Sequence, residues 1–145
     1  MEFKDFSLGL TQTKVARFAE ELSNGKIMAT ICKKCGKEYY PPRADCSNCM
    51  GSEMAWKPIG DEGRLATFTK IYVPPEHFAA RQSPMPFSSI QFEPCPIGLL
   101  EVEGGLRIMG WIPKVDLKKI HVGMKMKALP QTFANGKVTI ILQPI

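Results

Sequence analysis

The sequence of 145 residues has little histidine and no long apolar run. Its two histidines, His77 and His121, stand in no Ser/His/Asp or paired-carboxylate pattern, so we expect that the chain is not an enzyme in its own right. A catalytic role shared with a partner subunit stays open. No apolar run approaches the roughly 18 residues that a membrane-spanning helix needs, and we expect no membrane partner.

The first ten residues, MEFKDFSLGL, lack a basic start followed by an apolar stretch. We therefore expect no signal peptide and a cytoplasmic location, where cysteine clusters bind metal more often than they form disulfides. The formal net charge of +5 and the pI of about 9.0 fit an anionic partner, such as a nucleic acid or a phosphorylated cofactor. A merely solubilising surface would give the same charge.

Four of the five cysteines form two CxxC pairs with ten residues between them. These candidate ligands are Cys32, Cys35, Cys46 and Cys49. Glycines directly after the first pair and just after the second, Gly36 and Gly51, suit the tight turns of a rubredoxin-like zinc ribbon. We expect a closed, structural zinc site, with iron as the chemical competitor. The fifth cysteine, Cys95, lies between two prolines and is interpreted as a packing residue, with a reactive thiol as the alternative.

Residues 13–25, TKVARFAEELSNG, have apolar side chains at the spacing of one helical face. The residues that share this face are Val15, Phe18, Ala19 and Leu22. Thr11 or Thr13 can cap the start of this helix and Gly25 can end it. The apolar face can pack on its own domain or be presented to a partner, and both interpretations stay open.

The rest of the chain is typical of a small β-barrel. We expect a polar link at 53–63 anchored by Trp56, and strands at 64–73, 97–104, 106–112, 124–129 and 138–145. Gly104–Gly105 and Asn135–Gly136 are hairpin signals. The predicted fold is mainly β with an N-terminal helix: a helical segment at 1–29, a zinc ribbon at 30–58 and a five-stranded OB-fold barrel at 59–145. A generic barrel or sandwich is the alternative.

This order of elements closely resembles the rubredoxin-like zinc-ribbon and OB-fold proteins associated with acyl-CoA enzymes. The motifs that carry the resemblance are Cys32-Lys33-Lys34-Cys35-Gly36, Pro41-Pro42-Arg43, Cys46-Ser47-Asn48-Cys49, Gly63 with Thr67-Phe68-Thr69, and residues 120–123. It covers nearly the whole chain from about Ala19. Ser47 departs from the family, which commonly has proline there, and the link IGDEG is a residue longer than usual. We expect the serine to alter the rigidity of the turn and to leave metal binding intact.

The resemblance implies a non-catalytic accessory or scaffold subunit that holds acyl-CoA for a thiolase, a hydroxymethylglutaryl-CoA synthase or a related acyl-CoA enzyme. The zinc ribbon and helix would dock on that enzyme, and the barrel would lie near the CoA. Cations are needed for the CoA phosphates, and the candidates are Lys33, Lys34, Lys37, Arg43 and Arg64. Arg43 is favoured because two prolines precede it and its planar guanidinium suits phosphate. Its alternative role is to brace the ribbon on the barrel.

A nucleic-acid-binding module is the other function that the sequence leaves open. Zinc ribbons and OB-folds both occur in such proteins, and barrel aromatics can stack on bases. The aromatic candidates are Phe68, Tyr72, Phe87, Phe92 and Trp111. Aromatic residues make up only 9% of the chain, and its cations form no stripe along the strands. The accessory-subunit hypothesis is therefore preferred.

Overall fold

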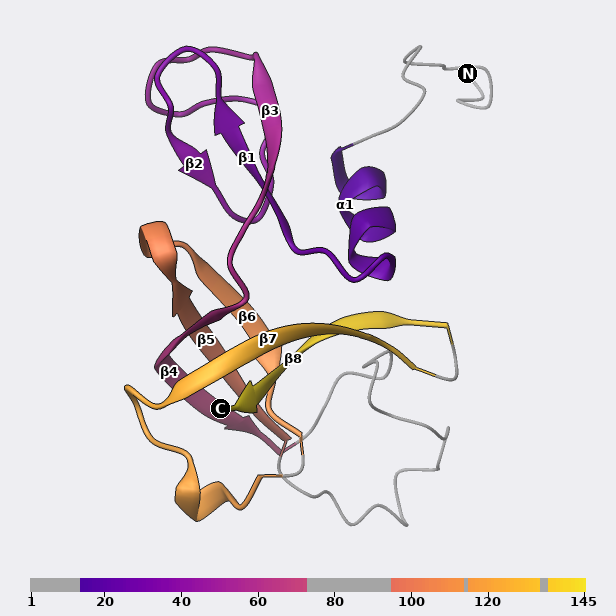
Figure 1. Cartoon of the computed structure of the whole chain (residues 1–145), viewed down its shortest axis with the longest axis vertical. Helices are drawn as coiled ribbons and strands as arrows, with labels where there is room; N and C mark the ends of the chain where they lie inside the picture. Colours follow the sequence, from indigo (N-terminus) through magenta and orange to yellow (C-terminus); the bar gives the residue numbers. More distant parts are fainter. Residues whose placement is uncertain (1–13, 73–94, 114, 134–135) are drawn as a thin grey trace, which may run out of the picture.

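The computed structural model describes residues 14–72, 95–113, 115–133 and 136–145. The predicted helix caps Thr11 and Thr13, the residues His77, Phe87 and Phe92, and the side chain of Cys95 lie outside this description. Within it, a small ribbon sheet lies at one end of the chain and a closed barrel at the other (Figure 1). No helix in the described parts is long and apolar enough to cross a membrane.

The predicted amphipathic helix is α1, Lys14–Ser23. It ends as expected at Gly25, whose φ of 80° is readily adopted by glycine. There the Gly25 N–H donates to the Leu22 carbonyl and the Lys26 N–H donates to the Glu21 carbonyl, at 3.0 and 2.9 Å. These two bonds form a Schellman motif, which satisfies carbonyls at the end of the helix and turns the chain into the ribbon.

The ribbon is a three-stranded antiparallel sheet in the order β2-β1-β3. Its strands are β1, Met28–Cys32, β2, Glu38–Tyr39, and β3, Met54–Pro58. The prediction that residues 53–63 form only a link was wrong for β3, which pairs along the whole of β1. This pairing and the burial of Met54 outweigh the weak strand pattern of MAWKP, in which a lysine and a proline occupy the exposed end.

The barrel consists of β4, Glu62–Ile71, β5, Cys95–Val102, β6, Arg107–Trp111, β7, Lys125–Thr132, and β8, Val138–Pro144. These strands close in the order β4-β5-β6-β8-β7. The β6–β8 pair is parallel and the others are antiparallel. Short 3-10 turns, η3 at Glu103–Gly105 and η4 at Leu117–Lys119, follow β5 and β6. The prediction of a five-stranded OB-fold barrel is confirmed.

The barrel encloses a core of aliphatic side chains from all five strands, and two glycines make room for them. Leu65, Leu100 and Leu142 are fully buried. Gly98 and Gly110 are cross-strand partners on β5 and β6. A Cβ at Gly98 would lie 2.6 Å from Leu65 Cδ1, and one at Gly110 would lie 2.9 Å from Leu142 Cγ. The narrow barrel therefore needs glycine where the leucines interdigitate.

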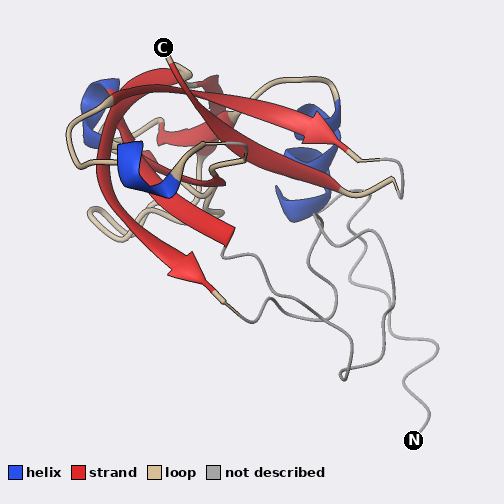
Figure 2. Cartoon of the chain, turned by 90° about the horizontal axis from the view of Figure 1, so that it is seen from below, coloured by secondary structure: helices blue, strands red, loops and turns tan. Residues whose placement is uncertain are grey.

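Helix α1 lies against β7 and β8 at one side of the barrel (Figures 1 and 2). Leu22 joins the barrel core, and Phe18 packs against it from a half-buried position. Ala19 is exposed, and Val15 is 76% exposed. The predicted apolar face thus divides: one part packs on the chain itself, and the other part is left at the surface.

Candidate metal centre and cationic surfaces

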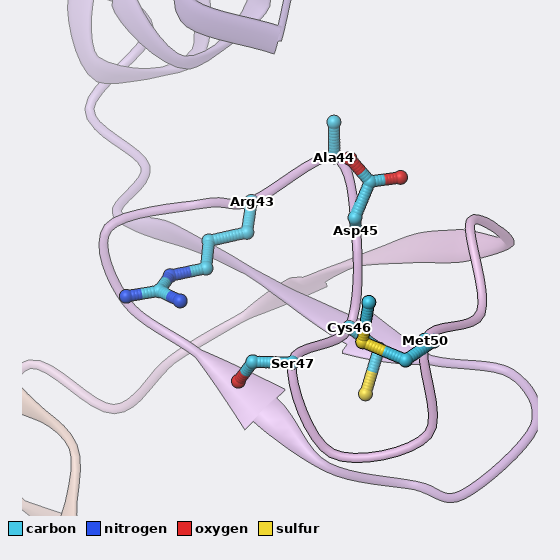
Figure 3. Close-up of a pocket in the computed structure, with 6 residues that line it drawn as sticks. All are labelled: Arg43, Ala44, Asp45, Cys46, Ser47 and Met50. Atoms are coloured by element: carbon cyan, nitrogen blue, oxygen red, sulfur yellow. The ribbon is translucent and has the colours of Figure 1, made fainter.

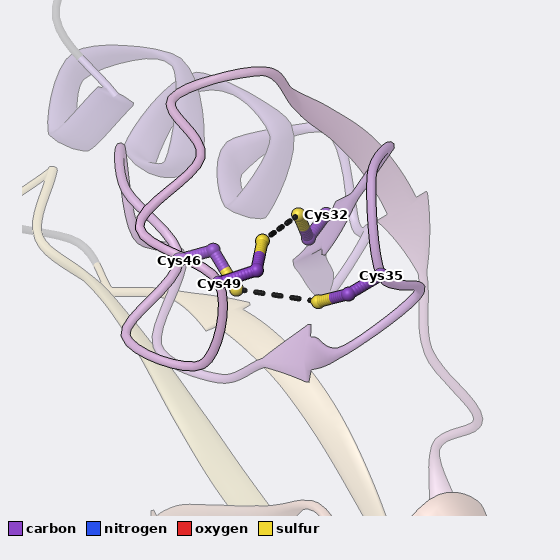
Figure 4. Close-up of side chains that lie close together, drawn as sticks. All are labelled: Cys32, Cys35, Cys46 and Cys49. Atoms are coloured by element: carbon purple, nitrogen blue, oxygen red, sulfur yellow. Dashed lines mark hydrogen bonds between the residues drawn. The ribbon is translucent and has the colours of Figure 1, made fainter.

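Two turns of the ribbon bring the four cysteine sulfurs together (Figure 4). The sulfurs of Cys32 and Cys49 lie 3.5 Å apart, as do those of Cys35 and Cys46. All four sulfur atoms lie within 4.8 Å of one another. Thiolates bound tetrahedrally to one zinc ion, at about 2.3 Å each, lie about 3.8 Å apart. The sulfur cluster therefore has the dimensions of a tetrahedral metal site, and its sulfurs are too far apart for disulfides.

Each turn is closed by backbone hydrogen bonds that repeat the same pattern. The Gly36 N–H donates to the Cys32 carbonyl at 2.8 Å, and the Met50 N–H donates to the Cys46 carbonyl at 2.9 Å. Gly36 has a φ of 73°, and Met50 reaches 57°. The expectation that a glycine follows the first pair for conformational reasons holds, whereas in the second turn a methionine takes the left-handed conformation and Gly51 does not.

Hydrogen bonds donated to a cysteine sulfur favour its thiolate form, whereas repulsion between neighbouring negative charges disfavours several thiolates at once. The pKa of Cys46 is lowered to about 6, first by the hydrogen bond from the Tyr39 hydroxyl. The Gly51 N–H is the largest single influence on Cys49 and lowers its pKa, but burial and the three neighbouring sulfurs together raise that pKa to about 12. Four thiolates at these distances need a cation between them. This donor set fits a divalent metal that prefers sulfur.

Tyr39 connects the sulfur cluster to the outside of the ribbon. Its ring is buried on β2, and its hydroxyl oxygen lies 3.2 Å from Cys46 Sγ and 3.1 Å from Ser47 Oγ. Lys37 Nζ and the Arg43 guanidinium carbon lie 5.7 and 5.3 Å from the centre of the same ring. The sequence analysis did not select Tyr39, although its place between the two CxxC pairs could have drawn attention to it.

Arg43 is braced within the ribbon and does not bridge it to the barrel. Its backbone N–H donates to Thr30 Oγ1 at 2.9 Å, and the Thr30 hydroxyl donates to its carbonyl at 3.2 Å. Thr30 is fully buried, so these bonds fix the loop. The side chain of Arg43 is exposed. It lines an open hollow of about 530 Å³, beside Ala44, Asp45, Cys46, Ser47 and Met50 (Figure 3).

The other predicted cations lie in different parts of the chain. Lys33 and Lys34 are exposed on the first cysteine turn. Arg64 is on β4 of the barrel, where its Nη1 donates to the Gly123 carbonyl at 3.0 Å. The cross-strand neighbours of Arg64 are Lys125 on β7 and Glu101 on β5. Of the five candidates, the structure brings together Lys37 and Arg43, through the Tyr39 ring.

A larger cleft of about 860 Å³ lies between the ribbon and the barrel. The ribbon contributes residues of the first cysteine turn, β2 and β3, and the barrel contributes the turn between β5 and β6. Its lining residues are Gly36, Lys37, Glu38, Lys57, Pro58, Ile59, Gly60, Glu103, Gly104, Gly105 and Leu106. Lys57 forms an ion pair with Glu38 on its wall. Of the predicted cations, Lys37 alone lines this cleft, and no motif in the sequence marked Lys57 as a candidate.

The three aromatic candidates that the structure describes have different environments. Phe68 is half-buried against the barrel core, and Tyr72 is 60% exposed at the end of β4. Trp111 packs on Phe133, with 5.9 Å between ring centres. Because Phe68 is half-buried and Trp111 is already packed on Phe133, these two rings give little support to the nucleic-acid alternative.

Two domain families match this arrangement in chain order. Residues 19–55 match the family described as the rubredoxin-like zinc ribbon domain of ChsH2. Residues 56–129 match the C-terminal OB-fold domain of ChsH2. The chain belongs to the ChsH2 zinc-ribbon and OB-fold family. This is the family, associated with acyl-CoA enzymes, that the sequence resembles.

A curated relative and two solved structures share this organisation. The DUF35 domain-containing scaffold protein of Methanocaldococcus jannaschii is 27% identical to this chain over 104 residues. The aligned residues make up 71% of this chain and 66% of that protein, so the chain spans just under two thirds of the relative's length. A structure described as the Ltp2-ChsH2(DUF35) aldolase superposes with a TM-score of 0.72 at 16% identity, over 95% of this chain and 98% of the other. A DUF35-family protein of unknown function from Sulfolobus solfataricus gives 0.60 at 20% identity, over 95% and 90%. At these identities the two structures establish the shared fold.

Proposed function

We propose that the chain is a non-catalytic accessory subunit, a scaffold that binds acyl-CoA for a thiolase-type or related acyl-CoA enzyme. The observation that carries the proposal is the closed cluster of four cysteine sulfurs. A metal held by all four has no open position for substrate, so it stabilises the fold and performs no chemistry. The relative named a scaffold protein supports an accessory role, and the match to the structure described as the Ltp2-ChsH2(DUF35) aldolase is consistent with an association with an enzyme.

We further propose that Cys32, Cys35, Cys46 and Cys49 bind one structural zinc ion. When bound, the metal supplies folding free energy that the ribbon's small core lacks. That core consists of Cys32, Tyr39, Cys46 and Met54, with Cys49 packed against it. Metal analysis of purified protein should give one zinc per chain. A result of one iron per chain would replace zinc by iron in this proposal. A protein purified without any bound metal would contradict the proposal.

The cleft between ribbon and barrel is the proposed place for part of the acyl-CoA. Its volume lies in the range of small-molecule sites. Lys37 is the cation we assign to a CoA phosphate, and Ile59 and Leu106 offer apolar contacts to the pantetheine arm. Arg43 opens onto the neighbouring hollow and can contact a second phosphate. Lys33, Lys34 and Arg64 stay as predicted contacts with no further support. The domain limits and the cytoplasmic location also stay predictions.

The accessory role is tested by adding the chain to a purified thiolase from the same organism. Acetoacetyl-CoA formation would be measured for the thiolase alone, for the chain alone and for the mixture, with light scattering to detect a complex. We expect no turnover by the chain alone, a stable complex and a changed acetoacetyl-CoA yield in the mixture. Turnover by the chain alone would contradict a non-catalytic role. Absence of any complex would contradict the thiolase partner.

A further inference from the structure

The Tyr39 hydroxyl lies where it can act on the metal site without binding the metal. It is 3.2 Å from Cys46 Sγ and 3.1 Å from Ser47 Oγ. A metal-bound thiolate carries no proton and can only accept. The Tyr39 O–H therefore donates to the Cys46 sulfur, and the Ser47 O–H donates to the Tyr39 oxygen. This assignment gives each hydroxyl proton one acceptor.

The surroundings hold the Tyr39 hydroxyl in that position. The Tyr39 side chain is only 8% exposed, and it belongs to the same buried cluster as Cys32, Cys46 and Met54. Its backbone is paired with Thr30 on β1. The cations of Lys37 and Arg43 lie over its ring. A tyrosine fixed by packing, pairing and charge keeps its O–H aimed at one sulfur.

We propose that Tyr39, supported by Ser47, is a positioning residue that tunes the metal site through a hydrogen bond to Cys46. Four thiolates around a divalent metal leave an excess of negative charge. A hydroxyl donor draws electron density from one sulfur, strengthens the retention of that ligand and slows its replacement. Ser47, at the position where the family commonly has proline, supplies the second donor in this chain. This inference rests on the proposed metal site.

The test uses the full chain loaded with Co²⁺ or Zn²⁺ and compares Tyr39→Phe, Ser47→Ala and the matched control Tyr72→Phe. Tyr72 is 60% exposed at the end of β4, away from the cysteine turns. Tyr39→Phe keeps the buried ring and removes only the hydroxyl. The readouts are the energy of the sulfur-to-cobalt charge-transfer band and the rate of zinc transfer to the chelator 4-(2-pyridylazo)resorcinol.

In Tyr39→Phe we expect the charge-transfer band to move to lower energy and zinc transfer to become about tenfold faster. Ser47→Ala should move both in the same direction by less, and Tyr72→Phe should move neither. An unchanged band in Tyr39→Phe and Ser47→Ala would overturn the inference, even if thermal stability fell. If Tyr39→Phe does not fold, the Ser47→Ala band decides alone. Failure of the unmodified chain to take up Co²⁺ would instead contradict the metal site itself.

Discussion

The guanidinium carbon of Arg17 lies 5.1 Å from the centre of the Trp56 ring, so a residue of α1 covers a residue of β3. Lys14 Nζ lies 5.3 Å from the same ring. At the other end of α1, Leu22 enters the barrel core. Between them, Phe18 packs edge-on against Tyr40 of the ribbon, with 6.0 Å between ring centres. The helix therefore contacts both modules and connects the ribbon to the barrel.

Removing the buried end of this connection should destabilise the protein. Leu22→Ala deletes a side chain that is 8% exposed within the barrel core, and we expect it to lower the free energy of unfolding by about 2–4 kcal/mol. Val15→Ala on the same helix is the control, since Val15 is 76% exposed, and its effect should stay within about 0.5 kcal/mol. Urea unfolding curves of the zinc-loaded proteins measure both. Equal effects would show that α1 does not pack as described.

Losing one cysteine of the cluster should release the metal and unfold the ribbon. Cys46→Ser removes a buried sulfur ligand, and three thiolates hold zinc far less tightly than four. We expect well below one zinc per chain and a loss of near-ultraviolet signal from the ribbon aromatics. Cys95→Ser, outside the two CxxC pairs, should keep one zinc per chain. A full complement of zinc in Cys46→Ser would contradict the assigned ligand.

A side chain at Gly63 should destabilise the protein, because the backbone of β5 lies too close. A Cβ at Gly63 would be 2.1 Å from the Glu101 carbonyl oxygen, and a backbone atom cannot move aside easily. We expect Gly63→Ala to cost about 1–3 kcal/mol in the free energy of unfolding. Gly60→Ala is the matched control, since nothing lies within 4 Å of its Cβ position. Thermal unfolding midpoints that fall equally in the two variants would refute the close approach of β4 and β5 at Gly63.

Burial of Tyr40 should make the protein sensitive to alkali. Desolvation raises the pKa of its hydroxyl from 10.0 to about 12. The unfolded chain therefore loses this proton first, and the stabilisation present below pH 10 is lost as the pH rises toward 12. Since Tyr40 is partly exposed, the loss is about 2 kcal/mol at most. Urea midpoints between pH 9 and 12 should fall less steeply for Tyr40→Phe than for the parent chain or Tyr72→Phe. Identical slopes would contradict the prediction.

The elements that the sequence predicted well are those with strong local signals. The cysteine spacing, the 3.6-residue period before Gly25 and the alternation of Met124, Met126 and Ala128 each depend on near neighbours in the chain. The structure confirms the helix and the barrel strands that they indicate. Strand β3 was missed because its pairing with β1 joins residues more than 20 positions apart, and no local pattern reports it.

The candidate site could be predicted only in part for the same reason. The two CxxC pairs identify a sulfur cluster from the sequence alone. The contacts of Tyr39 with Cys46 and Ser47, however, depend on how β2 lies against the second cysteine turn. The cleft joins Lys37 and Lys57 of the ribbon to Leu106 of the barrel, which only the packed fold brings together. The favoured Arg43 could be recognised as a cation, yet its fixation by buried Thr30 could not.

Binding of acetoacetyl-CoA to the zinc-loaded chain tests the central claim most directly. It would be titrated calorimetrically at low and moderate salt, in parallel with a labelled single-stranded oligonucleotide, for the parent chain, for Lys37→Ala and for the exposed control Lys26→Ala. The account predicts saturable CoA binding that persists at moderate salt and weakens only in Lys37→Ala, with oligonucleotide binding weak and abolished by salt. Tight oligonucleotide binding with no response to CoA would contradict it and make the chain a nucleic-acid-binding module.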